Sequence, residues 1–214
     1  SMIKSRAAVA FAPNEPLKIV EIDVEPPKAG EVLVRIVAAA VCGSDRSEIA
    51  GKDTGLTPRV LGHEAAGIVA AIGEETHTDL QVGDRVTMET DAVLCGRCHW
   101  CRTEQYQRCP NRLGIGRGAD GALADYLAMP ARALHKIPRN VSLLDAALTE
   151  PTAVAVHAVL DAELAGGVHA LALDLGRGAA DAAEVATWTP MPAPGDGVLV
   201  LDALMTIATD PLDR

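Results

Sequence analysis

At 214 residues the chain is long enough for one well-packed domain, or for one domain with a short appendage. Nineteen Lys and Arg against 29 Asp and Glu give a formal net charge of −10. Because no basic block occurs, these counts argue against nucleic acid or an anionic membrane as a partner. No apolar stretch approaches the ~20 residues of a membrane span, so we expect a cytoplasmic protein that acts on small molecules.

Short runs rich in Val and Ile, separated by Pro and Gly, predict β-strands through the first half of the chain. The expected strands are residues 6–11, 17–24, 31–40, 65–72 and 84–90. Aromatic residues are scarce, so the core must be built from Val, Ile, Leu and Ala. The pattern favours a β-barrel or β-sandwich.

Later segments differ in character. Residues 121–129 resume a strand-like pattern, and residues 143–164 are rich in Ala and Leu and predict a helix. Ser142 and Asp145 are available near its start, and Pro151 is expected to break or kink it. Beyond residue 161, Ala, Gly and Pro dominate.

Four of the five cysteines lie within fifteen residues, where hydrophobic periodicity disappears. They are Cys95, Cys98, Cys101 and Cys109, in the pattern Cys-x2-Cys-x2-Cys-x7-Cys. Clustered thiolates in a reducing compartment usually hold metal, and four of them predict a closed, structural zinc site. An iron–sulfur cluster uses similar ligands, and idle buried thiols are the plain alternative. With four sulfurs completing the shell, His99 and Trp100 are interpreted as loop residues.

Three other candidates are ambiguous by themselves. Cys42 lies in the segment Val-Cys-Gly-Ser-Asp, His63 follows twenty-one residues later, and Glu150 precedes a proline. A lone histidine is more often a structural residue than a metal ligand. A glutamate beside proline is usually a solvated residue at a helix start.

The order of these segments and their amino-acid sequences resemble those of the zinc-dependent medium-chain dehydrogenase/reductase family, which includes alcohol, sorbitol, glucose and threonine dehydrogenases. The resemblance covers residues 3 to about 160. It rests on five segments in order: 41–45, 62–69, 82–86, the four-cysteine lobe and 150–159. Residues 4–37 look most like the glutathione-dependent formaldehyde dehydrogenase branch. Residues 43–45 and 150–151 look like the polyol branch, which suggests a mosaic of engineered origin.

The resemblance implies a fold that is mainly β with peripheral helices. It implies a GroES-like β-barrel catalytic domain over residues 1–160, with a structural-zinc lobe at residues 91–112. Residues 161–214 would form a short Ala/Gly/Pro-rich C-terminal segment, too short for a full nucleotide-binding domain.

The resemblance also implies a second, catalytic zinc. Cys42 and His63 match two of its ligands, and Glu64 and Glu150 both match positions that bind the metal directly or through its water. Asp45 matches an acid that orients the histidine ligand. Ser44 matches the hydroxyl that passes the substrate proton.

The proton relay of the family often continues to a histidine shortly after this motif. Here that place holds Arg46 and Ser47. The exit route of the proton is therefore not predicted by the resemblance.

A nicotinamide cofactor belongs to this family, but the chain offers no complete site for it. The nearest match to a Gly-x-Gly-x-x-Gly fingerprint has Gly176 and Gly178, with Asp181 in the third place. A carboxylate in that place would repel the pyrophosphate of the cofactor. A chance match in an Ala/Gly-rich tail is therefore the better interpretation. Residues 203–214 faintly resemble the segment that re-enters the catalytic domain after the nucleotide domain.

These features predict a zinc-dependent alcohol or polyol dehydrogenase-like catalytic domain. We expect this domain to be truncated or engineered and, when it stands by itself, to be impaired in redox chemistry. We expect two zinc ions per chain, a small alcohol or carbonyl substrate and no NAD(P) binding. A homo-oligomer is compatible with this expectation. Two alternatives stay open: a non-redox zinc hydrolase or lyase with Glu64 or Glu150 as base, and a non-catalytic zinc-binding module.

Overall fold

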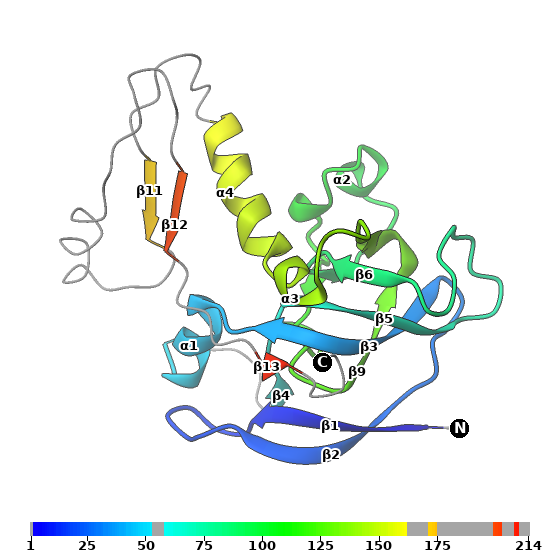
Figure 1. Cartoon of the computed structure of the whole chain (residues 1–214), viewed down its shortest axis with the longest axis horizontal. Coiled ribbons are helices and arrows are strands. Elements are labelled where there is room, and N and C mark those ends of the chain that lie inside the picture. Colours follow the sequence, from blue (N-terminus) through cyan, green and yellow to red (C-terminus); the bar gives the residue numbers. More distant parts are fainter. Residues whose placement is uncertain (1, 53–57, 162–170, 175–198, 203–207, 210–214) are drawn as a thin grey trace.

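The computed structural model of the chain describes residues 2–52, 58–161, 171–174, 199–202 and 208–209 (Figure 1). The strands are β1 Ile3–Ala10, β2 Lys18–Val24, β3 Glu31–Ala40, β4 Arg59–Val60, β5 Glu64–Ile72, β6 Arg85–Met88, β7 Asp91–Val93, β8 Leu113–Gly114, β9 Tyr126–Pro130, β10 Leu134–Lys136, β11 Leu171–Asp174, β12 Leu199–Asp202 and β13 Ala208–Thr209. The α-helices are α1 Gly43–Ile49, α2 His99–Arg102, α3 Leu143–Ala146 and α4 Thr149–Asp161, and short 3-10 helices cover Tyr106–Arg108 and Ala131–Ala133. The predicted fold class, mainly β with peripheral helices, is confirmed.

The central sheet is antiparallel and is built around β3. Its order is β10-β6-β5-β3-β13, and β9 also pairs with β3. Strand β5 follows one edge of β3, from Val32 paired with Ile72 to Ala40 paired with Glu64. The other edge is shared by β9, at residues 31–35, and β13, at residues 38–39.

The β1–β2 hairpin and β4 form a second sheet, which lies alongside the central one in Figure 1. The segment before β9 joins the two sheets. The Ala8 N–H donates to the Leu123 carbonyl at 2.8 Å, and the Ile36 N–H donates to the Asp125 carbonyl at 2.9 Å. The Arg6 guanidinium donates two hydrogen bonds to the Asp125 carboxylate, from Nε at 2.9 Å and from Nη2 at 3.0 Å. These bonds close the strands into the expected barrel.

The barrel core is aliphatic, as the composition requires. Val, Leu, Ile, Ala and Met side chains fill it, and no Phe, Tyr or Trp belongs to its buried set among the described residues. The largest fully buried apolar side chains are Leu61, Met129, Val32, Val34, Val69 and Val86. A second cluster packs α3 onto the outer face of β3 and β5.

Two predicted elements differ from the structure. The strand expected at residues 121–129 begins only at Tyr126, because Gly121, Ala122 and Leu123 instead donate their N–H groups to the carbonyls of residues 60–62. The single helix expected over residues 143–164 is two helices. Ser142 caps α3 as predicted, its hydroxyl accepting from the Asp145 N–H at 3.0 Å.

Pro151 does not break a helix, contrary to the prediction. The break falls upstream, after α3 ends at Ala146, and Pro151 is the third residue of α4. The first four N–H groups of a helix have no intrahelical acceptor, so a proline there costs no hydrogen bond. Glu150 is thereby placed in the first turn of α4, where the helix dipole favours a carboxylate.

The C-terminal part of the chain is described only in short pieces. Strands β11 and β12 pair in parallel, and β13 pairs with β3. Gly176, Gly178 and Asp181 of the partial fingerprint lie outside the described residues. The domain boundary near residue 160 stays a prediction. None of the helices in the described part of the chain is long and apolar enough to cross a membrane.

Gly67 fixes the contact between β5 and β3. A Cβ atom there would lie 2.2 Å from the Arg35 carbonyl oxygen, which belongs to the main chain and cannot swing away. Gly67→Ala is expected to destabilise the protein by about 3 kcal/mol, the upper end for overpacking. Thermal unfolding checks this. The control is Gly114→Ala, whose Cβ would make only an ordinary 3.5 Å contact. Equal melting temperatures for both variants would contradict the packing argument.

Candidate metal centres and an adjoining cavity

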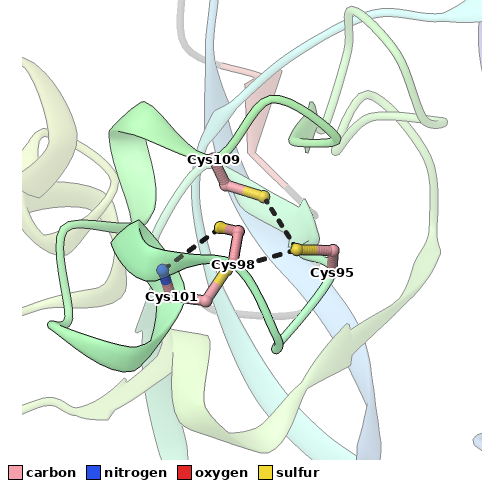
Figure 2. A group of neighbouring side chains, drawn as sticks. All are labelled: Cys95, Cys98, Cys101 and Cys109. Atoms are coloured by element: carbon pink, nitrogen blue, oxygen red, sulfur yellow. Dashed lines mark hydrogen bonds between the residues drawn. The ribbon is translucent and has the colours of Figure 1, made fainter.

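The four cysteines of the lobe converge, as Figure 2 shows. Their sulfur atoms all lie within 4.8 Å of one another, and none forms a disulfide. The Cys95 sulfur is 3.9 Å from that of Cys101 and 3.7 Å from that of Cys109. A tetrahedral site with Zn–S bonds of about 2.3 Å has sulfurs about 3.8 Å apart. The cluster therefore has the dimensions of a site for one tetrahedral metal ion.

These dimensions also bear on the iron–sulfur alternative. In a cluster of several irons the thiolates bind different iron atoms and stand farther apart than the ligands of a single ion. Four sulfurs within 4.8 Å of one another fit one metal ion better. Because zinc is the usual occupant of a four-cysteine site of this spacing, the geometry favours zinc.

The local chain explains how the sulfurs meet. Gly96, at φ 68°, permits the tight turn between Cys95 and Cys98. Cys98 is the N-cap of α2, and its sulfur accepts from the Cys101 N–H at 3.4 Å. Strands β7 and β8 pair across the base of the lobe. An ion pair between Arg112 and Asp91 reinforces that base.

His99 and Trp100 are not loop residues, contrary to the interpretation from spacing. They open helix α2, and their rings meet edge to face at 5.1 Å. The Arg108 guanidinium lies 5.0 Å from the centre of the Trp100 ring, so the indole supports the lobe by a cation–π contact.

Two of the four thiols, those of Cys95 and Cys101, have pKa values shifted in opposite directions. Backbone N–H groups of Arg97 and Cys98 lower the pKa of Cys95 to about 6. Burial and the neighbouring sulfurs raise the pKa of Cys101 to about 12. Close-packed sulfurs resist becoming thiolates together unless a cation compensates their charge.

A second group joins Cys42, His63 and Glu64, whose ligand atoms also lie within 4.8 Å of one another. Cys42 follows β3 as the N-cap of α1, while His63 and Glu64 stand where β5 begins. Since β3 and β5 run antiparallel with Ala40 opposite Glu64, the end of one meets the start of the other. Sheet register therefore brings together residues that are twenty-one positions apart.

Asp45 ties both sides of this group together. It is buried, and its carboxylate accepts from the Cys42 N–H at 2.9 Å and from the Gly62 N–H at 3.2 Å. One of its oxygens lies 3.7 Å from His63 Nδ1. An acid that faces one imidazole nitrogen is the usual second partner of a metal-bound histidine.

Charges in this group perturb one another. Burial opposes protonation of His63, but the Asp45 carboxylate and Cys42 outweigh it and raise the pKa of His63 to about 10. Burial raises the pKa of Glu64, against the opposing influence of Cys42 and His63. Burial likewise raises the pKa of Glu150. The site thus gathers more anionic groups than cationic ones, which favours a cation.

Glu64 carries the clearest sign of a missing partner. Its Oε2 atom is buried and has no hydrogen-bond partner. An unsatisfied buried polar atom costs on the order of 1–3 kcal/mol, and more when it is charged. Cys, His and Glu side chains form a ligand set that zinc accepts, so these residues fit a zinc ion.

Glu150 lies apart from the compact ligand group but beside the same cavity. This cavity of about 180 Å³ is lined by Ser44, Asp45, Glu48, His63, Thr90, Arg112, Gly114, Ile115, Gly116, Arg117 and Glu150. The structure therefore places Ser44, Asp45, His63 and Glu150 around one cavity, and the roles expected of them stay predictions. Glu64, and not Glu150, stands with Cys42 and His63.

Sequence reasoning missed Glu48, Arg112 and Arg117 as cavity residues. Glu48 follows Ser44 by four residues, which places both on one face of α1. Its carboxylate is held by Arg59 at 3.1 and 3.3 Å. The i, i+4 spacing was a usable signal, but α1 itself was not predicted. Arg46 and Ser47, which occupy the relay place, do not line the cavity.

Comparison with known proteins now defines the class. Residues 28–139 match the family described as the alcohol dehydrogenase GroES-like domain. The chain therefore belongs to that family, which confirms the resemblance to zinc-dependent medium-chain dehydrogenases.

Similarity to individual dehydrogenases supports this family assignment. D-arabitol-phosphate dehydrogenase of Enterococcus avium is 39% identical over 141 residues, covering 64% of this chain and 40% of that protein. S-(hydroxymethyl)glutathione dehydrogenase of Haemophilus influenzae is 51% identical over 110 residues, covering 51% and 29%. The structure of galactitol-1-phosphate dehydrogenase from Escherichia coli superposes with a TM-score of 0.71 at 26% identity, covering 79% of this chain and 48% of that one. The chain thus spans about half the length, or less, of these relatives.

Proposed function

We propose that this chain provides the zinc-binding catalytic domain of an alcohol or polyol dehydrogenase. The observation that carries the proposal is the convergence of Cys42, His63 and Glu64 beside a cavity, with Glu64 Oε2 buried and unpartnered. Zinc bound by these three side chains would supply a Lewis acid that lowers the pKa of an alcohol hydroxyl. The lobe cysteines would hold a second zinc that stabilises the domain and takes no part in chemistry.

The remaining residues of the cavity have distinct proposed roles. Asp45 positions His63 and fixes both ligand segments through its two backbone hydrogen bonds. The Ser44 hydroxyl would relay the proton of the substrate hydroxyl, releasing its own proton onward as it takes the substrate's. Glu150 supplies a second carboxylate at the cavity wall, within electrostatic reach of His63. Hydride transfer itself needs a nicotinamide, which accepts the hydride in this family.

Cobalt(II) replacement tests the proposal. Cobalt occupies zinc sites, and its visible absorption responds to its ligands. Adding ethanol is expected to change the absorption of the cobalt-loaded chain. An ion held by Cys42, His63 and Glu64, here called the cleft site, would keep one position open, whereas the lobe ion would have four sulfur ligands. Cys42→Ser serves as the control, because this variant should keep only the cobalt ion of the lobe. That ion would have four sulfur ligands, so its absorption should not change when ethanol is added. An unchanged spectrum of the unsubstituted chain at saturating alcohol would contradict the proposal.

The expectation that NAD(P) does not bind stays a prediction. Titration calorimetry of the 214-residue chain checks it. Tight, saturable binding of NAD would overturn this part of the proposal and would leave the zinc sites unaffected.

Asp45→Asn is expected to weaken zinc binding at the cleft site by about 10- to 100-fold, because the histidine ligand loses its charged partner. Competition with a chelator measures the change. The matched control is Asp23→Asn, an exposed acid on β2 that pairs with Lys4. If Asp45→Asn binds zinc as tightly as the control, Asp45 has no positioning role.

A further inference from the structure

The cavity beside the Cys42–His63–Glu64 group is lined by side chains of both charges. Asp45, Glu48 and Glu150 line it together with His63. Arg112 and Arg117 also line it, and they place positive charge there in a chain whose net charge is −10. These arginines lie where a substrate would bind under the proposed function.

Arg112 is held in a fixed orientation. It forms an ion pair with Asp91, and its Nη2 donates to Thr90 Oγ1 at 3.3 Å. A guanidinium carries five N–H donors in a rigid plane, so these contacts orient the group without using all its donors. An oriented guanidinium loses less entropy when it binds an anion than a mobile one does.

Arg117 is carried by a loop that is locked against the metal-binding segment. Its neighbour Gly116, at φ 74°, packs so closely on Gly62 that a Cβ atom would lie 2.8 Å from the Gly62 carbonyl oxygen. The Ala122 N–H donates to that carbonyl at 2.9 Å. Gly62 directly precedes His63, so the backbone fixes the loop of Arg117 relative to the proposed zinc ligand.

We infer that the cavity binds a phosphate ester of a small polyol, with a hydroxyl at the His63 and Ser44 end and the phosphate at Arg112 and Arg117. This inference rests on the proposed function, because the hydroxyl end is defined by the proposed metal. Two planar guanidinium groups match the several oxygens of a phosphate better than a single lysine does.

Direct binding tests the inference without relying on turnover. The zinc-loaded 214-residue chain is titrated by calorimetry with ribitol 5-phosphate, ribitol, inorganic phosphate and D-ribonate at one ionic strength. Charge-assisted hydrogen bonds predict that ribitol 5-phosphate binds at least about tenfold more tightly than ribitol. It should also bind more tightly than inorganic phosphate or D-ribonate, which lack one of the two recognised features.

Variants locate the phosphate. Arg117→Gln is expected to lower affinity for ribitol 5-phosphate by about tenfold and to leave ribitol binding unchanged. Arg112→Lys keeps a charge beside Asp91, and so protects the fold, but it loses the planar fork and should weaken binding in the same way. The matched control is Arg102→Gln. Arg102 is an exposed arginine at the end of α2 that does not line the cavity.

Several results overturn the inference. Equal affinity for ribitol and ribitol 5-phosphate is one such result. Another is a loss of affinity in Arg102→Gln equal to that in Arg117→Gln, because net charge alone would then explain the binding. Inorganic phosphate binding as tightly as the ester would show an anion site without polyol recognition, and tighter D-ribonate would show a carboxylate site.

Zinc content measured in the same samples separates the two proposals. A chain that lacks the cleft zinc refutes the proposed function. The effect of the Arg112 and Arg117 variants on binding of the phosphate ester is then measured in the protein without that zinc. A chain with the cleft zinc but no preference for the phosphate ester refutes only the substrate class.

Discussion

Replacing Cys98 by serine is expected to lower the zinc content of the chain from about two ions to about one and to unfold the lobe locally. Serine is itself a good N-cap residue, so α2 keeps its cap while the metal loses one thiolate. The three remaining sulfurs then no longer complete a tetrahedral shell. We expect the free energy of unfolding to fall by more than about 3 kcal/mol, because loss of a structural metal is among the largest effects of a point mutation.

Elemental analysis and thermal unfolding of Cys98→Ser check this expectation. Thr103→Ser is the control within the lobe, since it keeps the hydroxyl that donates to the His99 carbonyl at 3.0 Å. Zinc content that is unchanged in Cys98→Ser would refute the assignment of the lobe as a zinc site.

The reciprocal change, Cys42→Ser, is expected to remove the other zinc and to leave the lobe intact. Cys42 is likewise an N-cap residue, at the start of α1, so serine again preserves the helix while it removes a thiolate. Without the cation, the buried carboxylates of Asp45 and Glu64 lose their compensating charge. The melting temperature should fall less than in Cys98→Ser, because the cleft group sits on strands that pack around the barrel core.

Cys42→Ser also decides between functions. An alcohol dehydrogenase domain loses its response to alcohol in this variant. Ester hydrolysis that disappears in Cys42→Ser but needs no NAD would favour a zinc hydrolase. If both single variants retain about two zinc ions, neither cysteine is a ligand and both assignments are wrong.

How much of this site the sequence could predict depends on the range of the contacts. The lobe was predictable because its four ligands lie within one short segment, and spacing alone constrains their geometry. The pair Cys42 and His63 needed a family resemblance, since it is the register of β3 against β5 that brings them together. That register includes two irregularities, after Leu33 and after Ile36, which no alternating pattern announces.

The two arginines that line the cavity were not predictable for a related reason. Arg112 and Arg117 flank β8, a strand of two residues that is too short to show a hydrophobic period. Pro151 was misjudged because the rule that proline breaks helices applies to their interiors, and the start of α4 could not be located from composition. Sites formed within one short segment were therefore predictable from the sequence, while long-range contacts and the exact ends of helices and strands were not.

X-ray absorption at the zinc edge of the purified, unsubstituted chain tests the central claim most directly. One zinc with four sulfur ligands and one with a single sulfur from Cys42 give a mean of about 2.5 sulfurs per zinc, with nitrogen and oxygen neighbours supplying the rest. A mean of about four sulfurs would leave only the lobe site and would contradict the proposed catalytic centre.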